Sequence, residues 1–213
     1  MTIRAIFFDM DGVLVDAKQW HYEALNRALV LFGMEINLYD HLSTFDGLPT
    51  REKLKALSNT RNLPLELHEL INQLKQKFTR ELIEISCKPN FLHQYALSKL
   101  KGEGMIVGVC SNSMRRTISH MMELTRLDSY LDFILSSEDV SQPKPSSEMY
   151  LRACEMYQLI PKECVIIEDS EHGLKAAYAS GCNVLPVQNV NDVNYGNISS
   201  FILSLDRQSS PLF

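Results

Sequence analysis

Short apolar runs and amphipathic stretches alternate along most of this 213-residue chain. Apolar runs bounded by turn residues predict strands at residues 6–8, 105–110, 133–135, 165–167 and 183–187. Apolar residues that recur every three or four positions predict helices at 91–103, 115–124, 147–157 and 173–179. Strands that alternate with helices in this way predict a parallel sheet with right-handed crossovers.

The segment 17–87 breaks this rhythm, because its pattern is helical throughout. One face of a long helix is predicted from Leu67, Leu70, Ile71, Leu74, Phe78, Leu82 and Ile85. An earlier helix is predicted from Trp20, Ala24, Leu25, Ala28 and Leu29. An all-helical block after the first strand indicates an insertion. We therefore expect an α/β fold with two domains: a Rossmann-like parallel-sheet core of residues 1–16 and 88–213, and an inserted helical domain of residues 17–87.

The composition limits the classes of binding partner and indicates the cellular compartment. The net charge is −5 and no long basic run occurs, which argues against nucleic-acid binding. The five cysteines are scattered without a C-x-x-C spacing, which indicates free thiols in a reducing cytoplasm. No signal-peptide pattern and no apolar stretch long enough to span a membrane occur. We expect a cytoplasmic monomer or weak dimer that binds neither nucleic acid nor membrane.

Polar side chains stand at the ends of three predicted strands. They are Asp9 and Asp11 after the first strand, Ser111 after the second, and Glu168 and Asp169 after the fourth. Carboxylates are costly to remove from water, so their place at strand ends suggests a cation or chemistry there. The carboxyl ends of parallel strands are also where ligands bind in α/β proteins. The pattern therefore predicts one site built from several strand ends.

Each segment also has a plainer interpretation. An Asp-x-Asp-Gly sequence is a common turn. Ser111 and Asp169 are residue types that often cap helices. Lys144, between Pro143 and Pro145, could be a solvated surface lysine. The coincidence of all four segments in one chain favours a common site over four separate structural roles.

Together, these segments resemble the haloacid dehalogenase superfamily of phosphotransferases. Within it they resemble the β-phosphoglucomutase-like and small-molecule phosphatase branch. The resemblance rests on the run Asp-Met-Asp-Gly-Val-Leu-Val-Asp at 9–16, on Ser111, on Lys144 and on Glu168-Asp169, in that order. It extends over His21, the turn at 47–51 and the chain up to about Pro186. It implies that segment 17–87 is a cap, with hinges near residues 16–18 and 87–90.

The resemblance implies phosphoryl transfer by a pair of aspartates. Asp9 is the implied nucleophile, since a carboxylate can form an aspartyl-phosphate. Asp11 is the implied general acid and base, and true dehalogenases lack this second aspartate. Lys144 would hold a positive charge against Asp9 and the phosphate. Ser111 and Asn112, with the backbone N–H groups at a helix start, would bind phosphate oxygens.

The implied cofactor is Mg²⁺, which prefers a few carboxylates together with water and phosphate oxygens. The implied ligands are Asp9, Asp11 through its backbone carbonyl, Glu168 through water, and Asp169. In the cap, the resemblance implies that His21 couples closure to the acid/base aspartate. It implies that Arg51 and Lys75 contact the substrate phosphate. A structural histidine and two solvated charges are the plainer alternatives for these three residues.

These features predict a Mg²⁺-dependent phosphatase of a small phosphorylated metabolite, such as a sugar phosphate or a phosphoglycolate-like compound. A sugar phosphomutase of the β-phosphoglucomutase type is the first alternative, and a catalytically silent binding protein is the second. The chain has Met114-Arg115 where the mutase has Lys-Asn, Ala17 where it has Thr, and Ser147-Glu148 for the usual Pro-Asp. These departures weaken the mutase interpretation and leave the phosphatase chemistry intact.

Overall fold

The computed structural model describes residues 2–45 and 48–209. The chain divides into two compact units, one formed by Met1–Asp16 with Lys88–Phe213 and the other by Ala17–Cys87. The first unit is an α/β structure around a parallel sheet, and the second is helical. The predicted fold class is confirmed. Among the described helices, none is both long enough and apolar enough to cross a membrane.

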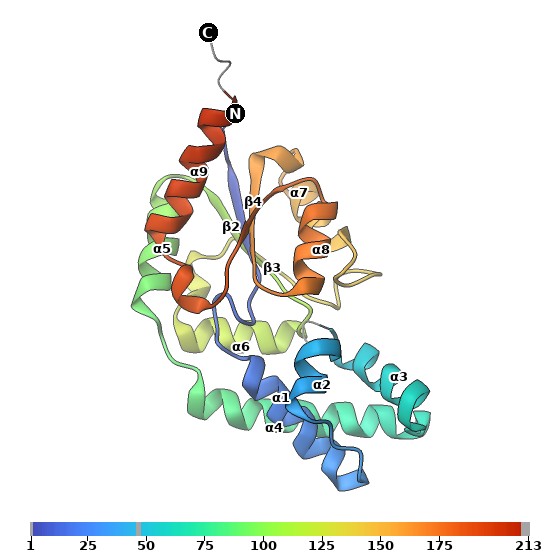
Figure 1. Ribbon diagram of the computed structural model, residues 1–213. Coiled ribbons are helices and arrows are strands. Elements are labelled where there is room, and N and C mark those ends of the chain that lie inside the picture. The colour runs from blue at the N-terminus through green and yellow to red at the C-terminus, as the bar shows by residue number, and fades with distance from the viewer. Residues whose placement is uncertain (1, 46–47, 210–213) are drawn as a thin grey trace. The chain divides into compact units, whose positions relative to one another are not determined.

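The sheet of the first unit has five strands in the order β3-β2-β1-β4-β5 (Figure 1). The strands are β1 Ala5–Phe8, β2 Ile106–Cys110, β3 Phe133–Leu135, β4 Cys164–Glu168 and β5 Asn183–Pro186. All neighbouring strands are parallel. The central strand, β1, is buried along its whole length, as a parallel strand with helices on both faces should be. Phe7 on one of its faces packs edge-on against Phe133, with ring centroids 5.6 Å apart.

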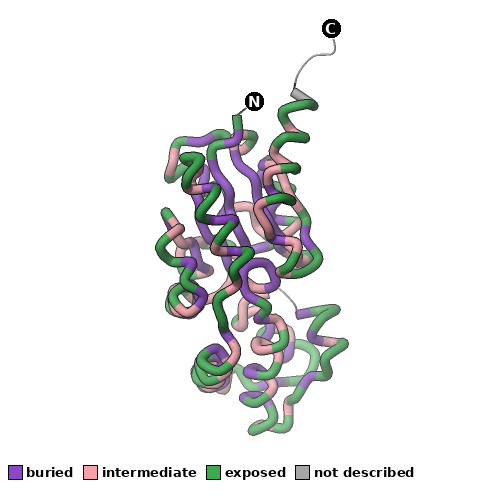
Figure 2. Tube along the Cα trace, turned by 90° about the vertical axis from the view of Figure 1, so that its left-hand side faces the viewer, coloured by how far each residue is buried: buried purple, intermediate pink, exposed green. Residues whose placement is uncertain are grey.

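Helices cover both faces of this sheet, with α5 and α9 on one side and α7 and α8 on the other (Figure 1). The helices of this unit are α5 Phe91–Gly102, α6 Arg115–Thr125, α7 Glu148–Met156, α8 Glu171–Ala179 and α9 Tyr195–Ser209. Short 3₁₀ turns lie at Asp128–Tyr130, Pro161–Glu163 and Val190–Asp192. The buried residues follow the strands through the middle of the unit (Figure 2). Helix α9 packs on α5 and was not predicted above.

The helical unit contains α1 Lys18–Leu29, α2 Leu38–Asp40, α3 Thr50–Arg61 and α4 His68–Ser86. A π-helical turn lies at His41–Phe45, and 3₁₀ turns lie at Val30–Phe32 and Leu65–Leu67. The core of this unit is formed by Leu25, Ala28, Leu29, Ile36, Phe45, Leu54, Leu57, Leu63 and Ile71. Helices α1 and α4 pack against each other.

The buried stripe of α4 differs from the predicted one. It runs at intervals of four through Ile71, Lys75, Thr79 and Ile83. Leu70 and Ile85, which were predicted to lie on the buried face, are 46% and 72% exposed. That part of the prediction is wrong, because α4 places a row of residues four apart inward, including two polar ones.

Candidate active site

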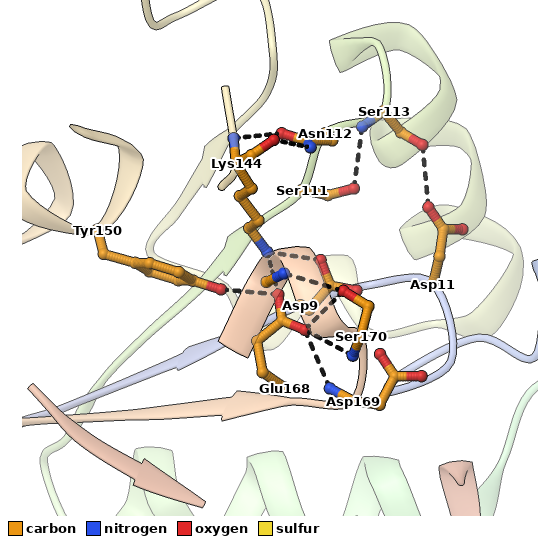
Figure 3. Close-up of polar contacts among 11 residues, drawn as sticks. Asp9, Asp11, Ser111, Asn112, Ser113, Lys144, Tyr150, Glu168, Asp169 and Ser170 are labelled. Carbon is orange, nitrogen blue, oxygen red and sulfur yellow. Dashed lines mark hydrogen bonds and ion pairs between the residues drawn. The ribbon is translucent and has the colours of Figure 1, made fainter. Parts of the chain in front are cut away.

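The carboxyl ends of three neighbouring strands bring polar side chains together (Figure 3). Asp9 directly follows β1, and its backbone N–H donates to the carbonyl of Ile167 at 3.0 Å. Ser111 directly follows β2, and Glu168 is the last residue of β4. The parallel register pairs Phe8 with Ile167, so β1 and β4 end almost level. Residues far apart in the sequence therefore meet at one edge of the sheet.

The ammonium of Lys144 lies at the centre of this group. Its Nζ donates to Asp9 Oδ1 at 2.7 Å and to Glu168 Oε1 at 2.5 Å. The lysine is only 3% exposed, so it is not the solvated surface lysine considered above. The Asn112 side chain holds the lysine backbone from both sides, since its Nδ2 donates to Lys144 O and its Oδ1 accepts from Lys144 N, each at 3.0 Å. The loop that carries the lysine is thus fixed from a second strand end.

Glu168 is fully buried and uses both of its carboxylate oxygens. Its Oε1 accepts from Lys144 Nζ and from the Tyr150 hydroxyl at 3.0 Å. Its Oε2 accepts from the backbone N–H groups of Asp169 at 3.0 Å and Ser170 at 3.3 Å, and from the Ser170 hydroxyl at 3.4 Å. A buried carboxylate is stable only when it is paired and hydrogen-bonded, and this one is.

Gly173 allows helix α8 to approach this carboxylate. A Cβ atom at this position would lie 1.9 Å from Glu168 Oε1, which no side chain could tolerate without movement of the carboxylate. The helix is capped by Ser170, whose hydroxyl accepts from the Gly173 N–H at 3.1 Å. Glu168 and Asp169 therefore precede the cap of α8. A strand end followed by a helix cap is the local structure that the plainer interpretation expected, but the cap is Ser170, and Glu168 contacts Lys144.

Asp11 lies in a tight loop after β1. Gly12 has a φ of 92°, which favours glycine, and its N–H donates to the carbonyl of Val15 at 2.7 Å. The strand ends at Phe8, so Asp9 and Asp11 are not placed by a common strand, and they contact different partners. Asp11 Oδ2 accepts from the Ser113 hydroxyl at 3.0 Å. The loop thus gives the two carboxylates different hydrogen-bond partners.

Ser111 is buried, with 1% of its surface exposed, and does not cap the following helix. Its hydroxyl oxygen accepts from the backbone N–H of Ser113 at 3.1 Å. The N-cap of α6 is Met114, whose side chain makes no cap hydrogen bond. The segment 111–113 is therefore a polar turn between β2 and α6, and its serines face the strand ends (Figure 3).

Negative charge exceeds positive charge in this group. Burial raises the pKa of Asp9 well above its ordinary value, and the carboxylates of Glu168, Asp11 and Asp169 add to the effect, although Lys144 opposes it. Burial disfavours the Lys144 ammonium, but Asp9 and Glu168 outweigh this and raise the lysine pKa. One lysine thus faces several carboxylates. Carboxylate oxygens of Asp9, Glu168 and Asp169 lie within 4.8 Å of one another, an arrangement that suits a cation.

The sequence also matches a known family. The model of haloacid dehalogenase-like hydrolases matches residues 6–187, a span that contains β2 to β5 and all of β1 except Ala5. The chain belongs to this family. Haloacid dehalogenase-like hydrolases are enzymes, so the polar group at the strand ends is the candidate active site of a hydrolase.

Two bacterial relatives of this hydrolase carry named activities. The chain is 27% identical to a phosphorylated carbohydrates phosphatase of Thermotoga maritima, over 84% of this chain and 82% of the relative. It is 25% identical to a fructose-1-phosphate phosphatase of Escherichia coli, over 86% and 95%. A crystal structure of β-phosphoglucomutase from Clostridium difficile superposes with a TM-score of 0.83 at 21% identity, covering 97% of this chain and all of the other. At that identity the superposition shows a shared fold.

The helical unit of this hydrolase carries the other predicted site residues. The Lys75 ammonium lies 3.2 Å from His21 Nδ1, and Lys75 is only 8% exposed, so it is not a solvated charge. An ammonium can only donate, so His21 accepts at Nδ1. The Arg51 side chain is 69% exposed and pairs with the adjacent Glu52 at 3.3 Å. Within the turn at 47–51, over which the resemblance extends, Gly47 lies outside the described residues.

Sequence reasoning missed three polar residues with defined positions. Ser113 contacts Asp11, and Tyr150 contacts Glu168. In the helical unit, Lys53 on α3 is 7% exposed. The serine could have been noticed from its place two residues after Ser111, but a tyrosine or lysine within a helix gives no such signal. Burial alone distinguishes these two from ordinary surface residues.

Proposed function

We propose that this hydrolase is a Mg²⁺-dependent phosphatase of a small phosphorylated metabolite, and that it works through a phospho-Asp9 intermediate. The observation that carries the proposal is the buried contact between Asp9 and Lys144 at the end of β1, with Asp11 in the next loop. The substrates named for relatives, phosphorylated carbohydrates and fructose 1-phosphate, support a sugar phosphate as substrate. Phosphoglycolate, named for another relative, is a further candidate.

The residues at the strand ends fit a magnesium ion. Mg²⁺ binds hard oxygen ligands and is usually held by one or two carboxylates. Asp9 and Asp169 would be the direct ligands, together with the backbone carbonyl of Asp11. Glu168 spends both oxygens on protein donors, so we assign it to positioning Lys144 and exclude it as a direct ligand. When bound, the ion would offset the negative charge of the phosphoryl oxygens.

In the first step, an Asp9 oxygen attacks phosphorus and the bond from phosphorus to the leaving oxygen breaks. Asp11 donates its proton to that oxygen, so the product leaves as an alcohol. Lys144 stabilises the negative charge that is shared between Asp9 and the phosphoryl group. Ser111 and the backbone N–H groups of the 111–113 turn would orient the phosphoryl oxygens. Asn112 contributes indirectly, because its side chain holds Lys144.

In the second step, Asp11 is a carboxylate and takes a proton from water. The resulting hydroxide attacks phosphorus, and the bond from phosphorus to Asp9 breaks. Inorganic phosphate leaves, and Asp9 returns as a carboxylate while Asp11 is again protonated. The Ser113 hydroxyl, which donates to Asp11 Oδ2, keeps this carboxyl group in place between the two steps.

We assign substrate selection to the helical unit, 17–87. His21 and Lys75 form a buried polar pair there, and Lys53 supplies a second buried ammonium. Ammonium groups form charge-assisted hydrogen bonds with phosphate oxygens, so these side chains suit a phosphorylated substrate. Arg51 is exposed and is the residue of this set most free to move toward a phosphate.

A sugar phosphomutase remains the alternative, because the fold alone fits both enzymes. A mutase needs a second cationic site that holds the intermediate while it reorients. Near the candidate active site, Met114 stands where the mutase has a lysine, and Arg115 is already engaged. Its guanidinium donates to Asp139 Oδ2 at 2.7 Å and to the carbonyl of Ile134 at 3.0 Å. Phosphate release is therefore the favoured outcome.

The test is a screen of phosphorylated metabolites with Mg²⁺ and with EDTA, followed by a paired assay of β-glucose 1-phosphate. Free phosphate and glucose 6-phosphate are measured together. We expect free phosphate, with no requirement for a bisphosphate activator. Rapid formation of glucose 6-phosphate with little free phosphate would favour the mutase. Absence of turnover across the whole panel would favour the binding protein.

A further inference from the structure

Three buried thiols converge at the amino end of β4, away from the candidate active site. Cys154 Sγ lies 3.6 Å from Cys164 Sγ and 3.8 Å from Cys182 Sγ. All three sulfur atoms lie within 4.8 Å of one another. Cys164 is the first residue of β4 and Glu168 the last, so the thiols are about 13 Å along the strand from the catalytic carboxylates at ~3.3 Å per residue.

The three thiols come from different elements of the first unit. Cys154 lies near the end of α7, Cys164 begins β4, and Cys182 immediately precedes β5. Val165 pairs with Asn183, so the two cysteines before them are neighbours across the sheet. Buried thiols often serve only as small apolar side chains. Convergence of three from separate elements is a stronger observation than the burial of any one.

The spacing of the sulfurs fits coordination to one ion. With a metal–sulfur bond of about 2.3 Å, two tetrahedral ligands stand about 3.8 Å apart and two trigonal ligands about 4.0 Å apart. The two sulfur–sulfur distances from Cys154, 3.6 and 3.8 Å, are close to these values. The third pair, Cys164 and Cys182, also lies within 4.8 Å, so a modest adjustment of the side chains would bring all three sulfurs to one ion.

The surroundings favour a soft ion with three ligands. Within the part of the chain that the structure describes, the group contains three cysteines and no histidine or carboxylate. Structural zinc sites are almost always four-coordinate, whereas soft thiolates select Cu⁺. Cys182 is the most exposed of the three at 7%, so an ion would enter the site at this sulfur.

We propose that Cys154, Cys164 and Cys182 form a buried three-sulfur site for one thiophilic d¹⁰ ion, with Cu⁺ as the preferred occupant. Binding replaces thiol protons, which leave to solvent, and sulfur lone pairs form the bonds to the ion. No sulfur is oxidised. The site is independent of the proposed phosphatase chemistry, whose hard oxygen ligands suit Mg²⁺.

The test uses the full chain, reduced, freed of metal and kept under anaerobic conditions. It is titrated with Cu⁺ and separately with Zn²⁺, then desalted. Bound metal per chain and the thiolate-to-metal charge-transfer absorption are measured. We expect one Cu⁺ per chain, with the absorption band and a raised melting temperature. We also expect that equimolar Zn²⁺ does not displace it. A wild-type chain without stoichiometric Cu⁺, or with Zn²⁺ bound as tightly, would overturn the proposal.

Two variants and a matched control locate the ion. Cys182→Ser and Cys154→Ala should each lose the stoichiometric Cu⁺, whereas Cys87→Ser, which removes a buried thiol of the other unit, should retain it. Retention of one Cu⁺ by either Cys182→Ser or Cys154→Ala would contradict the assignment. X-ray absorption of the wild-type Cu⁺ form needs no variant, so it also decides the matter if the variants fold poorly. Three sulfur neighbours are expected, and nitrogen or oxygen neighbours would overturn the site.

Discussion

The two ends of β4 hold buried polar groups that are stabilised in different ways. At the carboxyl end, Glu168 is an anion whose oxygens are occupied by Lys144, Tyr150 and backbone N–H groups. At the amino end, the Cys164 sulfur lies within 4.8 Å of two other thiols in an otherwise apolar cluster. The same helix, α7, serves both ends, since Tyr150 and Cys154 lie one turn apart on its buried face.

The two ends of β4 differ in how much the loss of one side chain destabilises the side chains that remain. Removal of one member from a buried set of charges leaves another charge uncompensated, which is strongly destabilising. A neutral thiol behaves as a small apolar group and leaves only a small cavity. The carboxyl end should therefore respond sharply to single substitutions, and its response should depend on which charge is removed. Four substitutions test this, in order of expected effect.

Asp9→Asn should have the largest effect and abolish turnover, because an amide cannot form the aspartyl-phosphate. In contrast to this loss of activity, the substitution should increase the free energy of unfolding. Burial raises the Asp9 pKa, so the metal-free wild type loses stability as pH rises from about 3.9 through the raised value. Urea unfolding in EDTA at several pH values should show this loss in the wild type and not in the variant. Substantial turnover by Asp9→Asn would rule out the proposed nucleophile.

Asp169→Ala should remove the response to Mg²⁺. The ion is expected to contribute several kcal/mol to the transition state, so turnover should fall about 10²–10³-fold. In the wild type, Mg²⁺ should raise the melting temperature relative to EDTA, and in the variant it should not. Ca²⁺ should inhibit the wild type, since it takes more ligands at longer distances. An undiminished Mg²⁺ shift in the variant would exclude Asp169 as a ligand.

Gly173→Ala should displace the Glu168 carboxylate, because the new methyl group would occupy its space. The new Cβ would lie 1.9 Å from Oε1, so the carboxylate must move and Lys144 must lose part of its support. Overpacking of this kind costs about 1–3 kcal/mol, and kcat should fall with it. Gly102→Ala is the matched control, since a Cβ there meets nothing within 4 Å. Equal unfolding free energies for the two variants would show that the close approach is not a constraint.

Tyr150→Phe should have the smallest effect. It removes one of the two side-chain hydrogen bonds to Glu168 Oε1 and keeps the ring that packs under the Lys144 ammonium. A hydrogen bond to a charged group is worth about 1.5–3 kcal/mol, and Lys144 still neutralises the carboxylate. We therefore expect a roughly tenfold lower kcat, an altered pH profile and little change in KM. Tyr157→Phe is the control, because that hydroxyl contacts only a backbone carbonyl at 3.3 Å. A pH profile like that of the wild type would contradict a positioning role.

Much of the fold could be read from the sequence because its strands are short apolar runs that end abruptly in polar residues. Helix α9 was missed, although Ile198, Phe201, Ile202 and Leu205 follow the helical spacing. The buried stripe of α4 could not be read, because it contains Lys75 and Thr79. A polar residue on a buried face carries no hydrophobic signal, so periodicity assigned Leu70 and Ile85 in its place.

The sequence by itself determined which chemical groups are available and that they stand at strand ends. Hydrophobic pattern encodes strands, and parallel strands bring their carboxyl ends together, so Asp9, Ser111 and Asp169 could be expected in one place. Only the tertiary structure decided the partners. It brings Glu168 into contact with Lys144 and Tyr150, and Asn112 into contact with the lysine backbone. It also places three distant cysteines together. These contacts depend on the packing of side chains between elements, which no local pattern along the chain records.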